Sequence, residues 1–225
     1  MQLIAHRGLA RSAPENSLAA FADALSCGFH GIETDVRLSA DGEAVLFHSR
    51  TVGAGIPVAA LSRAELSHLA GYLVPTLTEA LDAFPDAFWN IEIKTPAAAP
   101  VIQAELGARS ARQRPLLTSL RHEVIVAAAQ ATQPLDYGFI VWHRPVALNS
   151  LLYAAMPYSH LRTLVWFYES LDLALLQQAN ALGFRNYVFG AQTDHEHRLC
   201  EEFALHGLIT DHPEYVGLTV APPLQ

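Results

Sequence analysis

Short apolar runs alternate with segments of helical character from one end of the chain to the other. This alternation is typical of repeated βα units, in which parallel strands form one sheet and helices cover it. The pattern continues over 225 residues, close to the roughly 250 that an eightfold barrel of such units usually needs. We therefore predict the α/β class and a (β/α)8 TIM barrel, formed by a single domain over residues 1–225.

The apolar runs give nine candidate strands, one more than an eight-stranded barrel contains. They are residues 3–6, 31–36, 44–48, 89–94, 115–118, 138–142, 163–167, 187–189 and 207–210. The turn-like segment Ser39-Ala40-Asp41-Gly42 lies between the second and third candidates. These two therefore form either a hairpin or two ordinary barrel strands, and the sequence leaves open which candidate is the extra one.

Helix starts are indicated where a Ser or Thr is followed three residues later by a Glu, the pattern of a capping box. The pairs are Ser62 with Glu65, Thr76 with Glu79, and Thr193 with Glu196. Thr95-Pro96 predicts a further helix start. Residues 51–75 are rich in Gly, Ala and Ser around a short helix at 62–70, so we expect a short insertion there, after the third strand.

The composition favours a compact protein, because 51% of the residues are hydrophobic and 16% are charged. A net charge of -8 argues against nucleic-acid binding over a broad face. Two cysteines, Cys27 and Cys200, are too few for a disulfide framework, so we expect reduced thiols. No run approaches the roughly 18 apolar residues of a membrane span, and no basic, apolar leader opens the chain. We expect a cytoplasmic protein without stable membrane insertion.

Two candidate strands carry carboxylates on one face. In Ile32-Glu33-Thr34-Asp35-Val36 the period of two places Glu33 and Asp35 together, and Asn90-Ile91-Glu92-Ile93-Lys94 repeats the design with Glu92. Converging carboxylates repel one another unless they take up protons or a cation compensates them. A divalent cation is the simplest solution, and oxygen ligands favour Mg²⁺ or Ca²⁺, with Mn²⁺ as a further option.

Two histidines end candidate strands. His6-Arg7-Gly8 closes the first, where Gly8 lets backbone approach a ligand and Arg7 offers a bidentate donor to a phosphate. His48 closes the third. Cleavage of a phosphodiester needs one group that accepts a proton and another that donates one. Two histidines beside a carboxylate cluster therefore indicate this chemistry.

Other polar and aromatic clusters have plainer interpretations. The capping box at Thr193 places His195-Glu196-His197 in the first turn of a helix, where residues two apart do not share a face, so we expect a structural or surface role. Trp142-His143-Arg144-Pro145 and Trp166-Phe167-Tyr168-Glu169 follow candidate strands. They either shape the mouth of the barrel or pack at its rim.

Taken in order along the chain, these segments resemble the glycerophosphodiester phosphodiesterase family over almost the whole length. The matching segments are His6-Arg7-Gly8, Pro14-Glu15-Asn16, residues 33–38 with Asp41-Gly42, the apolar run into His48, Val74-Pro75-Thr76-Leu77, residues 90–94 and residues 207–211. The resemblance implies that His6 and His48 form a general acid/base pair. It also implies Glu33, Asp35 and Glu92 as metal ligands, and Arg7 and Lys94 as phosphate contacts.

The chain departs from the family pattern at two places. Ser49 stands where the family usually has an Asp directly after the second histidine, which removes a charge that could orient His48 or raise its pKa. Val188-Phe189-Gly190-Ala191-Gln192 replaces the family's aromatic-Thr-Val-Asn run. Phe189 is the residue here that we expect to line the substrate pocket.

The resemblance implies metal-dependent hydrolysis of small-molecule glycerophosphodiesters to an alcohol and glycerol 3-phosphate, with two histidines as acid and base. Two alternatives stay open. One is lysophospholipase D-type activity on lysophospholipids, which needs an apolar groove at the barrel mouth. The other is a catalytically weak phosphodiester-binding barrel, because of Ser49. The sequence leaves open which histidine is the acid, the leaving alcohol and the oligomeric state.

Overall fold

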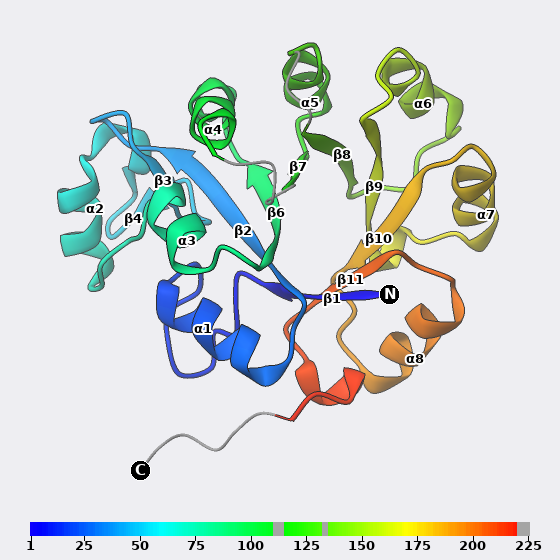
Figure 1. Ribbon diagram of the computed structural model, residues 1–225, viewed down its shortest axis with the longest axis horizontal. Helices are drawn as coiled ribbons and strands as arrows, with labels where there is room; N and C mark the ends of the chain where they lie inside the picture. The colour runs from blue at the N-terminus through cyan, green and yellow to red at the C-terminus, as the bar shows by residue number, and fades with distance from the viewer. Residues whose placement is uncertain (110–114, 132–134, 220–225) are drawn as a thin grey trace.

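The computed structural model describes residues 1–109, 115–131 and 135–219. Eight parallel strands form a closed barrel in which β1 pairs with both β2 and β11 (Figure 1). The predicted TIM barrel is therefore confirmed. Its strands are β1 (Gln2–His6), β2 (Gly31–Leu38), β6 (Phe88–Ile93), β7 (Leu116–Ser119), β8 (Asp136–Val141), β9 (Leu161–Phe167), β10 (Arg185–Phe189) and β11 (Gly207–Thr210).

Helices surround the ring of strands, one after each strand except the last (Figure 1). They are α1 (Leu18–Cys27), α3 (Leu77–Ala83), α4 (Ala98–Gly107), α5 (His122–Ala129), α6 (Asn149–Ala155), α7 (Leu173–Ala181) and α8 (Asp194–Glu202). A short 3-10 helix, η3 (Pro213–Val216), follows β11. Among the described residues, no helix is both long enough and apolar enough to cross a membrane.

The extra strand is the third candidate, and the hairpin alternative is confirmed. β3 (Ala44–Leu46) pairs antiparallel with β2, with Leu46 opposite Val36, and takes no place in the closed ring. β3 also ends earlier than expected. The prediction that His48 ends this strand was wrong, because only the Phe47 N–H continues the pairing, to the Asp35 carbonyl at 3.0 Å.

The segment after β3 is the predicted insertion. It contains a small hairpin of β4 (Thr51–Val52) and β5 (Ile56–Pro57), the 3-10 helix η1 (Val58–Ala60) and the helix α2 (Arg63–Ala70). Its apolar side chains form a small separate cluster that includes Val58, Leu66 and Val74. The cluster also includes Val45 of β3, so the insertion packs against that strand, apart from the main core.

Local capping signals located most helix starts correctly. All three capping boxes are formed, in α2, α3 and α8, with both reciprocal hydrogen bonds present. The start predicted at Thr95-Pro96 is displaced, because α4 begins at Ala98 after Ala97. Here the backbone carbonyl of Thr95, rather than its side chain, accepts from the Ala98 N–H at 3.1 Å.

Two apolar layers stabilise the barrel and determine the direction in which its polar side chains point. Inside the ring, Ile4, Leu116, Ile140, Val165, Tyr187 and Ile209 pack together. Outside it, the larger core between strands and helices includes Ile32, Val36, Ile91 and Ile93. Because these four point outward, the alternating residues of β2 and β6 point inward. The polar face predicted for both strands therefore lines the barrel interior.

We predict that Ile32→Ala destabilises the protein by about 2 to 5 kcal/mol, because it removes buried methyl groups from between β2 and the surrounding helices. Ile32 is 0% exposed. The free energy of unfolding, measured by urea denaturation, tests this. The matched control is Leu73→Ala, whose side chain is 72% exposed and whose loss should change stability by less than about 0.5 kcal/mol. Equal stability of the two variants would contradict the assignment of the outer core.

Candidate active site

Three carboxylates meet at the inner face of two neighbouring strands. Glu33 and Asp35 come from β2 and Glu92 from β6, with Asp35 directly opposite Glu92 in the strand register. One oxygen from each lies within 4.8 Å of the others. All three are buried, at 5%, 1% and 9% exposure respectively. The structure thus brings together the three residues that were predicted as metal ligands.

Two positively charged side chains lie against this cluster. The Lys94 ammonium is 2.8 Å from Asp35 Oδ1 and 2.9 Å from Glu92 Oε2. The Arg7 guanidinium is 3.1 Å from Asp35 Oδ2, and the Arg7 backbone N–H donates to Glu33 Oε2 at 3.1 Å. Arg7 and Lys94 were predicted as phosphate contacts. Their positive charges compensate the carboxylates. Both side chains also line the pocket beside the cluster.

The protonation of the three carboxylates follows from burial and neighbouring charge. Burial, followed by repulsion from Asp35, raises the pKa of Glu33 to about 8. Burial would also raise the pKa of Asp35, but the charges of Lys94 and Arg7 outweigh it and lower that pKa. For Glu92, burial raises the pKa despite Lys94. At neutral pH the metal-free cluster therefore keeps Asp35 charged and a proton on Glu33.

The oxygen set suits a hard divalent cation. All three residues offer carboxylate oxygens, the ligands that Mg²⁺ and Ca²⁺ prefer. Asp35 Oδ1 is buried and accepts no aligned hydrogen bond within the described ranges, although the Lys94 ammonium lies close to it. Glu33 carries a proton that a cation can displace. These features fit a cation held by Glu33, Asp35 and Glu92.

Asn16 supports Asp35, a role that sequence reasoning missed. Its side chain donates to Asp35 Oδ2 at 2.9 Å and accepts from the Asp35 N–H at 3.2 Å and from Thr34 Oγ1 at 2.6 Å. Asn16 is fully buried and has a φ of 56°, a left-handed conformation that Asn tolerates better than most residues. The segment Pro14-Glu15-Asn16 was noticed only as part of the resemblance.

His6 is held by a carboxylate from the other end of the chain. Its Nδ1 lies 3.0 Å from Asp211 Oδ2, just beyond β11. Burial lowers the pKa of His6, but the hydrogen bond to Asp211 and the charges of Glu33 and Asp211 outweigh burial and raise it overall. Asp211 was part of the predicted segment 207–211, but its contact with His6 was not foreseen.

His48 lies across the pocket in a different environment. Its ring is half-buried and has no hydrogen-bond partner in the part of the chain that the structure describes. Burial, reinforced by the charges of Arg7 and Lys94 against that of Asp35, lowers the pKa of His48. Ser49 follows it and is exposed. The surroundings of His6 thus stabilise its charged form and those of His48 its neutral form, relative to a free imidazole.

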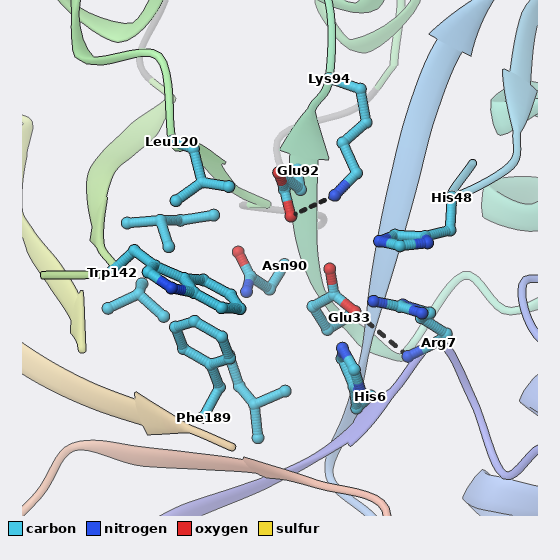
Figure 2. A pocket seen from close by; sticks show the side chains of 13 residues that line it. His6, Arg7, Glu33, His48, Asn90, Glu92, Lys94, Leu120, Trp142 and Phe189 are labelled. Atoms are coloured by element: carbon cyan, nitrogen blue, oxygen red, sulfur yellow. Dashed lines mark hydrogen bonds and ion pairs between the residues drawn. The ribbon is translucent and has the colours of Figure 1, made fainter. Parts of the chain in front are cut away.

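The pocket between these residues has a volume of about 220 Å³. Figure 2 shows His6, Arg7, Glu33, His48 and Lys94 on one side and Leu120, Trp142 and Phe189 opposite them. The remaining apolar lining consists of Ile140, Val165 and Ile209. Phe189 thus lies where the sequence placed it. The pocket therefore combines an ionic half with an apolar half.

Of the two aromatic segments whose role was open, one contributes to the mouth. Trp142 lines the pocket and stacks on Phe167, with ring centroids 4.5 Å apart and an interplanar angle of 4°. Trp166 is instead buried in the outer core, where its Nε1–H donates to Asn186 Oδ1 at 2.8 Å. Trp142 thus shapes the mouth, whereas Trp166 takes neither expected role, because β9 continues to Phe167 and places Trp166 in the outer core.

The His195-Glu196-His197 cluster is structural, as expected. His197 is fully buried in α8, and its ring nitrogens lie 2.7 Å from Thr210 Oγ1 and 2.7 Å from the Thr193 carbonyl. The contact with Thr210 joins α8 to β11, and the contact with the Thr193 carbonyl lies within the first turn of α8. His195 is exposed on the same helix, so the two histidines do not converge on one ligand.

The sequence matches the model of the glycerophosphoryl diester phosphodiesterase family over residues 6–215. The chain belongs to this family. It is therefore a phosphoric diester hydrolase, and enzymes of the glycerophosphoryl diester phosphodiesterase family commonly depend on divalent metals. The acidic cluster in the pocket is consistent with that property.

Individual relatives agree with the family assignment. A glycerophosphodiester phosphodiesterase of Caldanaerobacter subterraneus subsp. tengcongensis is 27% identical, and the alignment covers 94% of each chain. A Mycobacterium tuberculosis protein named "Probable glycerophosphodiester phosphodiesterase 2" is 39% identical over 105 residues, which is 42% of this chain and 39% of the relative. This chain thus spans well under two thirds of the length of the Mycobacterium tuberculosis relative. It spans nearly all of the Caldanaerobacter enzyme.

A solved structure shares the fold. The Oleispira antarctica phosphodiesterase, solved in complex with the product sn-glycerol-3-phosphate, superposes with a TM-score of 0.84 at 24% identity. The alignment covers 96% of this chain and 95% of that one. The likeness supports the barrel fold of this family member.

We predict that cation binding releases a proton from the pocket at about pH 7, because Glu33 with its pKa of about 8 must ionise to become a ligand. Affinity should rise with pH until Glu33 is ionised and then level off. Calorimetric titration with Mg²⁺, Ca²⁺ or Mn²⁺ in buffers of different ionisation enthalpy counts the released protons. The same titration about two units higher in pH is the control, where release should vanish. Proton-neutral binding at both pH values would contradict this account.

Proposed function

We propose that this enzyme hydrolyses glycerophosphodiesters to an alcohol and glycerol 3-phosphate, using one divalent cation held by Glu33, Asp35 and Glu92. The observation that carries the proposal is the buried three-carboxylate cluster, within 4.8 Å, of which Glu33 and Glu92 line a pocket together with His6 and His48. Glycerol 3-phosphate is the product bound to the Oleispira antarctica phosphodiesterase, which shares the fold. Mg²⁺, Ca²⁺ and Mn²⁺ are the candidate cations.

The ionic half of the pocket binds the phosphodiester group. A bound divalent cation supplies Lewis-acid stabilisation of charge on a phosphoryl oxygen. Arg7 and Lys94 add positive charge that is already fixed in place by their carboxylate contacts, so little rearrangement is needed when negative charge develops. The apolar half, including Phe189, packs against the organic part of the substrate and keeps water away from these charges.

The two histidines transfer protons. One accepts a proton from the attacking hydroxyl or water, and the other donates one to the departing alkoxide. Both rings line the pocket. Asp211 orients His6 through its hydrogen bond to Nδ1, which leaves Nε2 as the nitrogen that is free to face the substrate.

We predict that turnover of glycerophosphocholine requires a divalent cation, and that His6→Ala and His48→Ala each lower kcat by about 10² to 10⁴-fold. A coupled assay for glycerol 3-phosphate, run with Mg²⁺, Ca²⁺, Mn²⁺ or a chelator, measures both effects. An activated phosphodiester with a nitrophenol leaving group separates the two roles, because it needs no protonation as it departs. The histidine whose loss is least harmful on that substrate is the acid.

The control variant is His68→Ala, an exposed histidine on α2, which should keep the wild-type rate. Activity that survives the chelator would argue against the cation. Near-normal rates in both pocket variants would remove the histidines from the mechanism.

The apolar half of the pocket favours a second candidate substrate class, the lysophospholipids. A groove of about 460 Å³ adjoins the pocket and shares Leu120, Ile140 and Trp142 with it. None of the described residues that line this groove is Asp, Glu, Lys or Arg; the others are His122, Val141, His143, Pro145 and Leu151. Leu120 and Trp142 are each 44% exposed. A hydrocarbon chain can therefore leave the phosphate site over these two side chains and be buried in the groove.

For this second class we predict that kcat/KM for an acyl lysophosphatidylcholine exceeds that for glycerophosphocholine by about tenfold or more, since each buried methylene contributes about 0.8 kcal/mol. Leu151→Asp should remove that advantage while leaving glycerophosphocholine turnover unchanged, because Leu151 lines the groove and not the phosphate pocket. Leu151 also packs against the main core, so the variant's free energy of unfolding is measured alongside. Leu182→Asp is the matched control, at a 50% exposed position beyond α7. A preference for glycerophosphocholine in the wild type would rule the groove out as an acyl site.

A further inference from the structure

The inner face of β2 carries a third charged residue beyond the two metal-ligand candidates. Arg37 follows Glu33 and Asp35 at the same period of two. Its guanidinium donates twice to one acceptor, the backbone carbonyl of His48, from Nε at 3.0 Å and from Nη2 at 2.7 Å. The strand that supplies two carboxylates is therefore tied directly to the histidine across the pocket.

His48 has few other restraints on its position. It lies beyond the end of β3, and its ring has no hydrogen-bond partner within the described ranges. The backbone on either side is bonded, through the Phe47 N–H to the Asp35 carbonyl at 3.0 Å and through the Arg50 carbonyl to the Val58 N–H at 3.0 Å. Between these two bonds, the backbone of His48 itself is held by the two hydrogen bonds from Arg37 to its carbonyl. By contrast, His6 is held through its ring by Asp211.

We propose that Arg37 is a positioning residue for His48. By donating two hydrogen bonds to the carbonyl, the guanidinium fixes the backbone from which the imidazole extends into the pocket. Such a fork of two donors holds one orientation, whereas a lysine ammonium would act as a point charge on a flexible stem. The proposal rests on the proposed function in one respect, that His48 transfers a proton.

The geometry separates this role from direct contact with substrate or cation. Arg37 is absent from the described residues that line the pocket, while Arg7 and Lys94 are among them. The charged groups that influence the Arg37 guanidinium are Asp35, Glu92 and Arg50. Since Arg37 does not line the pocket, its loss should affect proton transfer by His48 and leave substrate binding largely intact. The loss of its positive charge near Asp35 and Glu92 should not weaken cation binding.

The test is Arg37→Met, alone and in the His48→Ala background, assayed with glycerophosphocholine and the activating cation. We expect kcat to fall by about 10- to 100-fold in the single variant, as for a misplacement of a catalytic group by about 1 Å. KM and cation affinity should stay within about twofold. In the His48→Ala background, Arg37→Met should cause no further loss, because residues that act as one unit are not additive.

Three further variants complete the experiment. Arg37→Lys should recover part of the lost kcat, because it keeps the charge but not the fork. Arg37→Gln, with one amide donor, replaces the Met variant in every comparison if that variant fails to unfold cooperatively at the wild-type temperature. Arg198→Met is the matched control, since Arg198 is exposed on α8 and pairs with Asp194.

The outcomes are distinguishable. A wild-type kcat in Arg37→Met, or a further loss of rate in the His48→Ala background, would overturn the positioning role. A loss of cation affinity in Arg37→Met would overturn it as well, in favour of an effect on the carboxylates. A wild-type rate in His48→Ala alone would instead reject the proposed function at His48, whatever Arg37 does.

Discussion

The arrangement of this active site depends on the compensation of three carboxylates buried within 4.8 Å of one another. Such a cluster is costly unless protons or cations offset its charge, and each neighbouring feature serves that end. Lys94 bridges Asp35 and Glu92, and Arg7 contacts Asp35. Glu33, with a pKa of about 8, retains a proton. The site is therefore close to neutral without a bound ion, and it can exchange the Glu33 proton for additional positive charge from a cation.

The barrel holds this cluster in place through apolar packing on the outer faces of its strands. On β2 and β6 the isoleucines and valine that flank the carboxylates are buried against the helices, so apolar packing holds each strand in a single register. A shift by one residue would move the acidic side chains into the outer core. The same packing that stabilises the fold therefore determines where Asp35 and Glu92 meet. The loops after the strands contribute side chains that surround these two carboxylates.

The sequence was most informative where the decisive interactions are local. Alternation along a strand predicts which face Glu33, Asp35 and Glu92 share, and a capping box is complete within four residues. In the structure Glu33, Glu92, His6 and His48 line one pocket, and Asp35 lies buried beside the two glutamates. Asn16, Asp211 and Arg37 were not foreseen, because each acts through a partner distant along the chain or on another element. The end of β3 was misplaced because apolar residues continue to Phe47, whereas the strand ends at Leu46 and only the Phe47 N–H bonds further to β2, at the Asp35 carbonyl.

The two histidines are held by different means, and this difference bears on their chemistry. Asp211 binds the ring of His6 itself, so the contact that orients the imidazole also favours its charged form. Arg37 binds the backbone of His48, and the ring has no hydrogen-bond partner among the described residues. The backbone is thus restrained without a carboxylate bonded to the ring, and the charge of Asp35, which raises the pKa of His48, is outweighed by burial and by the charges of Arg7 and Lys94. A pair that must hold opposite protonation states at one pH needs such unequal surroundings. Serine at position 49 fits this arrangement, because a carboxylate there would make the surroundings of the two rings more alike.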